Sequence, residues 1–161
     1  MDAGRACALA EQLHRGQRDA GGAPLLEHVR RVAATVAPEA RVVAWLHEAL
    51  EHTSMSEQTL LAQGLSTSEL RAIRLVTHDN IARSNTSYLA HIELLARARG
   101  DGARLARSVK RADLADRVCN PAVRPDGWSP PYAHALEILT RRRLAVVAPE
   151  TDLRGSEAVS R

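Results

Sequence analysis

Two histidines and two glutamates lie close together in one predicted helix, and these side chains could perform metal or proton chemistry. On a helical wheel of residues 42–53, one side carries His47, Glu48, Glu51 and His52, while the apolar residues share the other. Imidazole and carboxylate groups ligate metals or carry protons, and no Lys or Arg lies between positions 41 and 71 to neutralise them. The pattern indicates a reactive helix face, with an ordinary solvated polar face as the alternative interpretation.

A third histidine lies on the preceding predicted helix. His28 belongs to the segment 25–36, whose apolar positions recur at helical spacing and which ends before Pro38. A hairpin between this helix and the next one, predicted over 39–53, can bring His28 alongside His47. A histidine with a purely structural role is the alternative interpretation.

Asp113 is the candidate carboxylate of a later helix, predicted over 102–118. Lys110, Asp116 and Arg117 stand three or four positions from it, so the four charges form one stripe. Such a stripe can be an ion-pair face. Together with the residues of the two earlier helices, however, Asp113 completes a set of two histidines and two carboxylates. That set suits a divalent ion that retains some waters and has a base nearby.

Four motifs follow one another along the chain. They are HRGQR at 14–18, GAPLLEH at 22–28 with RVA at 31–33, AWLHEALEHT at 44–53 and VKRADLAD at 109–116. This series resembles the HD-domain metal-dependent phosphohydrolases, in particular the RelA/SpoT-type hydrolase domain and the small alarmone hydrolases. The resemblance spans roughly residues 5 to 145. It implies an HD-domain helical bundle with one divalent ion, typically Mn²⁺, that hydrolyses a phosphorylated nucleotide.

The resemblance also implies a role for each candidate residue. The metal ligands would be His28, His47, Glu48 and Asp113. The residues that handle the attacking water would be Glu51 and His52. The residues on the substrate side would be Arg18, Lys110 and Arg117.

The chain departs from the family pattern within these motifs. The family's His-Asp pair is His47-Glu48 here, and its Glu-Asp pair is Glu51-His52. Arg117 stands where alarmone hydrolases often have Asn. The changes at Glu48 and His52 motivate a second hypothesis behind the leading one, a degenerate HD domain that binds a nucleotide or a protein partner without turnover. A purely structural helical protein is the third hypothesis.

The composition favours an all-α fold. Hydrophobic residues make up 45% of the chain, but there is no Phe and only two Trp and two Tyr. The rest of the apolar content is mainly Ala, Leu and Val, and the first two favour helices. We expect helices over 2–16, 25–36, 39–53, 66–77, 86–99, 102–118 and 130–147, with a short one inside 54–64. These would form a single HD-type domain over 1–148, followed by a disordered tail over 149–161.

Charge and apolar runs narrow the class of partner. The net charge of +3, from 22 Lys and Arg against 19 Asp and Glu, is too small and too evenly spread for a nucleic-acid interface. No stretch is apolar enough for a signal peptide or a membrane span. Cys7 and Cys119 are isolated, which favours two buried, reduced thiols. We expect a soluble cytoplasmic protein with a small nucleotide as partner and no membrane contact, and the oligomeric state stays open.

Overall fold

The computed structural model describes residues 1–78, 84–121 and 129–147, with side chains up to Arg141. This part of the chain is helical and contains no strand, which confirms the predicted all-α class. The helices are α1 (Ala3–Leu13), α2 (Leu25–Thr35), the 3₁₀ helix η1 (Pro38–Ala40), α3 (Arg41–Leu46), α4 (Ala49–His52), α5 (Glu57–Ala62), α6 (Thr67–Val76), α7 (Asn85–Arg97), α8 (Asp101–Cys119) and α9 (Tyr132–Val147). The tail predicted over 149–161 lies outside the described residues.

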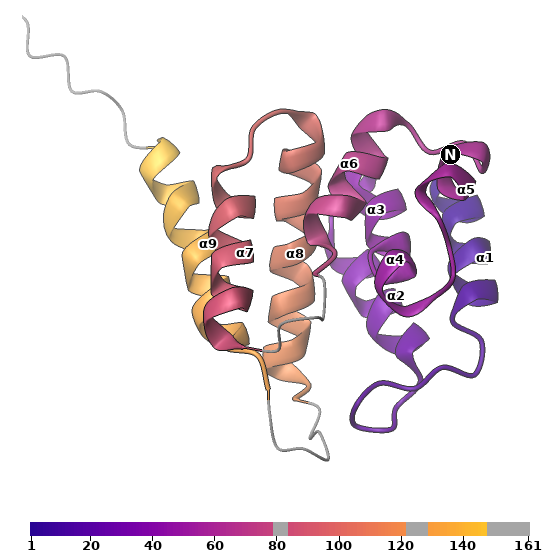
Figure 1. Ribbon diagram of the computed structural model, residues 1–161, viewed down its shortest axis with the longest axis horizontal. Helices are drawn as coiled ribbons and strands as arrows, with labels where there is room; N and C mark the ends of the chain where they lie inside the picture. Colours follow the sequence, from indigo (N-terminus) through magenta and orange to yellow (C-terminus); the bar gives the residue numbers. More distant parts are fainter. Residues whose placement is uncertain (79–83, 122–128, 148–161) are drawn as a thin grey trace, which may run out of the picture.

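Helix α8 is the central element of the bundle. Figure 1 shows α7, α8 and α9 side by side in one half of the molecule, with α1 to α6 forming the other half. Helix α8 packs on α9 and α7 on one side, and on α6, α2 and α3 on the other. The largest fully buried side chains are aliphatic and come from both halves: Leu46, Leu60, Ile73, Ile92, Leu95, Leu114 and Leu139. A chain poor in aromatic residues therefore builds its core from branched aliphatic side chains.

Helix starts follow the capping residues of the sequence. Asp2 caps α1, Ser56 caps α5, and Ser66 forms a capping box with Glu69 at the start of α6. Ser84 accepts a hydrogen bond from the backbone N–H of Ser87, so this polar segment caps α7. Among the described helices, none is long and apolar enough to cross a membrane.

The predicted continuous helix over 39–53 is wrong. The chain instead forms η1, α3 and α4, and the helical pattern is interrupted at His47 and Glu48. The Nδ1 atom of His47 lies 2.6 Å from the carbonyl oxygen of Ala44. In an uninterrupted helix this oxygen would accept the amide of Glu48. A side-chain bond to the backbone therefore accompanies the break at the candidate site.

The prediction of two buried thiols is also wrong. Cys7 is half-buried in α1, and Cys119, the last residue of α8, is exposed. Both cysteines are free. Cys119 lies beyond Leu114, the last buried residue of α8, so the end of the helix that carries this thiol is outside the aliphatic core.

Candidate metal centre

Four predicted ligands meet at the junction of α2, α3–α4 and α8. The ligand atoms of His28, His47, Glu48 and Asp113 all lie within 4.8 Å of one another, and all four residues are buried. The Nε2 atom of His28 is 3.2 Å from Nε2 of His47 and 3.2 Å from Oδ1 of Asp113. Oε1 of Glu48 lies 3.2 Å from Nε2 of His47 and 3.5 Å from Nε2 of His28. The structure thus brings together side chains separated by up to 85 positions.

The two imidazole rings are fixed by bonds on their outer nitrogens. Nδ1 of His47 can only donate to the carbonyl oxygen of Ala44, at 2.6 Å. Nδ1 of His28 lies 2.6 Å from a carboxylate oxygen of Asp116, which favours a proton on that nitrogen too. Metal-binding histidines in proteins are held in this way, with Nδ1 on a carbonyl or carboxylate and Nε2 free for the ion. Two nitrogens and two carboxylates in this arrangement fit a divalent metal.

Arg117 and Lys110 neutralise the two buried carboxylates. Arg117 donates from Nε to Oδ1 of Asp113 at 2.6 Å, and its Nη2 bonds to Oε1 of Glu48. Nζ of Lys110 lies 2.8 Å from Oδ2 of Asp113. Burial opposes ionisation, but the nearby Arg117 and Lys110 outweigh it and hold the pKa of Asp113 well below its usual range. The pKa of Glu48 is depressed in the same way, by Arg117 and by the hydrogen bond to His28.

The same two carboxylates raise the pKa of His28, whereas their own pKa values are lowered. Burial disfavours a charged imidazole, but the hydrogen bonds to Asp113 and Glu48 prevail and raise the pKa of His28 to about 9. Asp116 adds a further partner outside the cluster and also binds Arg31 through two hydrogen bonds of 2.6 and 3.0 Å. The protein's own positive groups therefore balance the cluster charge.

The predicted water-handling residues lie beside this cluster. Nε2 of His52 is 3.0 Å from Oε2 of Glu48 and 4.0 Å from Oε1 of Glu51. The hydrogen bond to Glu48 raises the pKa of His52 against a smaller opposing effect of burial. Glu48 therefore has one oxygen on the four-residue cluster and the other on His52. These three residues form a second group whose ligand atoms lie within 4.8 Å of one another.

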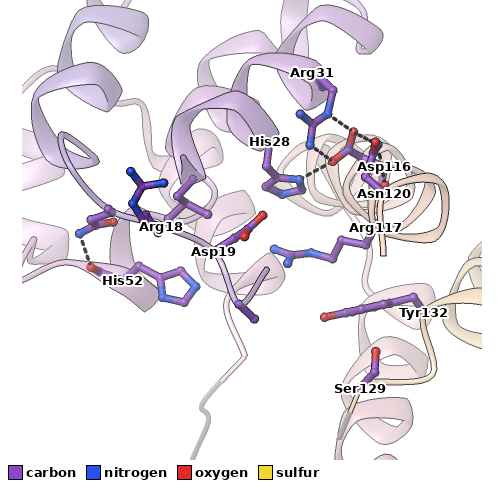
Figure 2. Close-up of a pocket in the computed structure, with 13 residues that line it drawn as sticks. Arg18, Asp19, His28, Arg31, His52, Asp116, Arg117, Asn120, Ser129 and Tyr132 are labelled. Atoms are coloured by element: carbon purple, nitrogen blue, oxygen red, sulfur yellow. Dashed lines mark hydrogen bonds and ion pairs between the residues drawn. The ribbon is translucent and has the colours of Figure 1, made fainter. Parts of the chain in front are cut away.

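An open pocket of about 260 Å³ leads from the surface to His28. Figure 2 shows Arg117 reaching across this pocket from α8, between His28 and Tyr132. The predicted substrate residue Arg18 lines the pocket from the loop between α1 and α2, where it donates to the carbonyl oxygen of Gly22 at 2.6 Å. Arg31 lines it from α2. The pocket thus places arginine side chains at the approach to the cluster.

A second, smaller cavity of about 60 Å³ also has Arg117 in its wall, and we call it the inner cavity because the buried residues His47, Glu48 and Lys110 line it. Lys110 lines this inner cavity rather than the open pocket, and it is buried over the ring of Tyr88. Burial raises the pKa of Tyr88 to about 12. The pocket and the cavity share three wall residues, His52, Arg117 and Tyr132. Arg117 and Tyr132 are also in contact, with the guanidinium carbon 5.7 Å from the ring centre.

The predicted charge stripe on α8 divides between two sets of partners. Lys110 and Arg117 both bind Asp113, as i,i+3 and i,i+4 spacing predicts. Asp116 instead faces α2, where it binds His28 and Arg31. Sequence reasoning assigned no site role to Asp116 or to Tyr132. The one available signal was the position of Asp116, three residues beyond a candidate ligand on the same helix.

No protein-family model matches this chain, and the search of the curated proteins also finds no match. The likeness to the HD-domain phosphohydrolases therefore stays a prediction that depends on the order of the motifs. The structure contributes an independent observation, the buried group of two histidines and two carboxylates that could hold a metal ion.

Proposed function

We propose that the chain is a divalent-metal-dependent phosphohydrolase that cleaves a phosphoester or pyrophosphate of a nucleotide, with alarmone-like substrates included. One observation carries the proposal. The Nε2 atoms of His28 and His47 meet at 3.2 Å beside two carboxylates, while both Nδ1 atoms are engaged elsewhere. Two such nitrogens facing one another favour a shared cation between them. Mn²⁺ is the ion that the motif resemblance suggests, and the cytoplasmic location stays a prediction.

A divalent ion bound there would acidify a water molecule and polarise a phosphoryl oxygen. Glu51 lies on α4, four residues after His47 and beside the cluster, so its carboxylate can accept the proton of that water. The raised pKa of His52 favours its protonated form, which suits donation to the leaving oxygen. In this proposal Glu51 is the general base and His52 is the general acid.

Substrate phosphates would enter through the open pocket. Arg18 and Arg31 line it, and Arg117 reaches into it, so all three can neutralise phosphate oxygens. Lys110 binds Asp113 from the inner cavity. We therefore propose that Lys110 holds Asp113 in position, and that the predicted substrate contacts are made by Arg18 and Arg117.

Metal binding is the first test. The protein should be stripped with EDTA and titrated with Mn²⁺ in a calorimeter, with metal content measured by elemental analysis. We expect one tightly bound ion in the wild type and none in His47→Gln. His134→Gln, an exposed histidine on α9, is the matched control and should bind as the wild type does. Equal metal content in the wild type and His47→Gln would reject the site.

Catalysis is the second test. A panel of phosphorylated nucleotides with Mn²⁺ should show phosphate or pyrophosphate release by the wild type. Glu51→Gln should lower the rate about 10²- to 10⁴-fold, the usual contribution of a general base. Glu57→Gln is the control, because Glu57 lies on α5 and pairs with Arg74 at the surface. If wild type and Glu51→Gln are equally inactive on every substrate, the enzymatic proposal is wrong.

A binding module without turnover is the second candidate function. The observation that favours it is the complete neutralisation of Glu48 by the chain itself, through Arg117 on one oxygen and His52 on the other. Nucleotide binding with no product release, and without stoichiometric metal, would support this candidate over the enzyme.

A further inference from the structure

Arg117 binds the same two oxygens that the proposed metal site would use. Its Nε is 2.6 Å from Oδ1 of Asp113, and its Nη2 bonds to Oε1 of Glu48. These are the oxygens nearest to Nε2 of His28, at 3.2 and 3.5 Å. A guanidinium is a planar cation whose donors match two carboxylate oxygens at once. It therefore satisfies the charge and the hydrogen bonds of the cluster together.

We propose that Arg117 is a built-in competitor for the metal, which closes the site in the metal-free protein and moves into the open pocket when the ion binds. This inference rests on the proposed metal site and adds a means by which the chain regulates that site. The two oxygens bonded to Arg117 also lie beside the histidine nitrogens, so an ion bound there would compete with the guanidinium for the same two negative charges.

The surroundings of Arg117 provide a place for the released side chain. Its side chain is 27% exposed, whereas those of Glu48 and Asp113 are 3% and 0% exposed. Arg117 lines both the open pocket and the inner cavity, and Tyr132 flanks it. A rotation toward the open pocket keeps the cation solvated near Tyr132. It also presents the guanidinium where substrate phosphates would enter.

Lys110 is not a second competitor. It binds Oδ2 of Asp113 at 2.8 Å, whereas Oδ1 is the oxygen directed at His28 and Arg117. Lys110 is also buried and lies over Tyr88, within the inner cavity. The two cations of α8 thus have different tasks, since Lys110 supports Asp113 from behind while Arg117 occupies the metal side.

Titration with Mn²⁺ alone tests the inference without any turnover measurement. Full-length wild type, Arg117→Gln and Arg107→Gln are stripped with EDTA and compared in the same calorimeter. Arg107 lies on α8 and donates to backbone carbonyl oxygens of α7 and its C-cap, so its variant removes a charge without touching the cluster. We expect Arg117→Gln to bind Mn²⁺ at least about tenfold more tightly than the wild type, and Arg107→Gln to stay within about twofold.

Thermal unfolding in EDTA and then in saturating Mn²⁺ gives a second readout. Arg117→Gln should have a lower Tm than the wild type without metal, because two buried carboxylates lose their cation, and should regain more of its Tm with metal. Arg117→Lys keeps the charge but cannot bridge both oxygens, so a smaller gain in Mn²⁺ affinity is expected. This variant tests the inference even if Arg117→Gln does not fold.

The outcomes separate the inference from the proposed function. Suppose that the wild type binds Mn²⁺ tightly and both Arg117 variants bind it equally or more weakly. This result would overturn the proposal that Arg117 competes with the metal, and the proposed metal site would stand. An absence of Mn²⁺ binding in the wild type and in both variants would overturn both. Tighter Mn²⁺ binding by the Arg117 variants and not by Arg107→Gln, with a larger gain in Arg117→Gln than in Arg117→Lys, supports the competition between Arg117 and the metal.

Discussion

The two halves of α8 are stabilised in different ways. The first half, from Asp101 to Val109, buries small and aliphatic residues and approaches α6 so closely that a Cβ on Gly102 would lie 2.8 Å from the carbonyl oxygen of Ser68. The second half buries Lys110 and Asp113 and carries the charges that meet α2 and Glu48, between α3 and α4. One helix therefore serves as an aliphatic packing element at one end and as a charged scaffold at the other.

The difference teaches that the stability contributed by the second half depends on the ionisation of its charged residues. Apolar burial stabilises the first half whatever the ionic conditions. The loss of stability caused by a substitution there depends on how well the new side chain fits the packing. A buried charge stabilises the fold only while its partners are present and ionised, since the penalty for leaving it unpaired exceeds the gain from pairing it. The second half should therefore respond to charge removal and to pH, whereas the first half should respond to added volume.

Asp113→Asn should give the largest loss of stability in the metal-free protein. The change leaves the buried Lys110 and the partly buried Arg117 against a neutral amide, and breaking a buried pair costs about 3–5 kcal/mol. Urea unfolding in EDTA measures it. The control is Asp101→Asn on the same helix, an exposed residue 3.8 Å from Arg104, which should change stability by less than about 1 kcal/mol. Similar values for the two variants would mean that the halves do not differ.

The stability of the metal-free protein should also fall as the pH rises from about 6.5 to about 9. Folded His28 has its pKa raised from 6.5 to about 9, so between these values the folded state keeps a proton that the unfolded state has released. Stability from this source is complete below pH 6.5 and is lost above pH 9, a decrease of about 3 kcal/mol. The pKa of His52 is also raised and acts in the same direction.

Urea unfolding in EDTA at several pH values checks this dependence. His28→Asn should remove most of the slope, whatever its effect on absolute stability. Gly102→Val, in the aliphatic half, should leave the slope unchanged. A slope that persists in His28→Asn would assign the titration to another group.

Gly102→Val should destabilise the aliphatic half by about 2 kcal/mol, as overpacking usually does. The added side chain would meet a backbone carbonyl of α6 at 2.8 Å and Cβ of Arg71 at 3.1 Å, so the helices must separate. Ala90→Val, at an exposed position of α7, is the control and should cost only a few tenths of a kcal/mol from helix propensity. A neutral Gly102→Val would show that α6 and α8 can move apart freely.

The sequence predicted the aliphatic half better than the charged half. Apolar spacing located α8, because the burial of apolar groups imposes a helical periodicity on the sequence. It could not show that Asp113 is fully buried or that Asp116 faces α2, since a charge stripe looks the same on a solvated surface. Nor could it show the interruption at His47, because that depends on a side chain bonding to the backbone. The residues of the cluster were predicted, while their mutual contacts depend on three helices meeting.

Arg31→Gln should have the smallest effect, although Arg31 makes two hydrogen bonds to Asp116. The Arg31 side chain is 43% exposed, and pairs of this kind contribute at most about 1 kcal/mol. Asp116 would keep two other partners, Nδ1 of His28 at 2.6 Å and the amide of Asn120 at 3.1 Å. Urea unfolding in EDTA should therefore show a loss below about 1 kcal/mol.

Arg104→Gln is the matched variant at the aliphatic end of α8. Arg104 is exposed and lies 3.6 Å from Glu39, so its removal should also cost less than about 1 kcal/mol. Equal small losses for Arg31→Gln and Arg104→Gln would place the difference between the halves in their buried charges, because exposed arginines would then contribute alike at both ends. A loss of stability above about 2 kcal/mol for Arg31→Gln alone would show that the charge-dependent region includes Asp116, the carboxylate that orients His28.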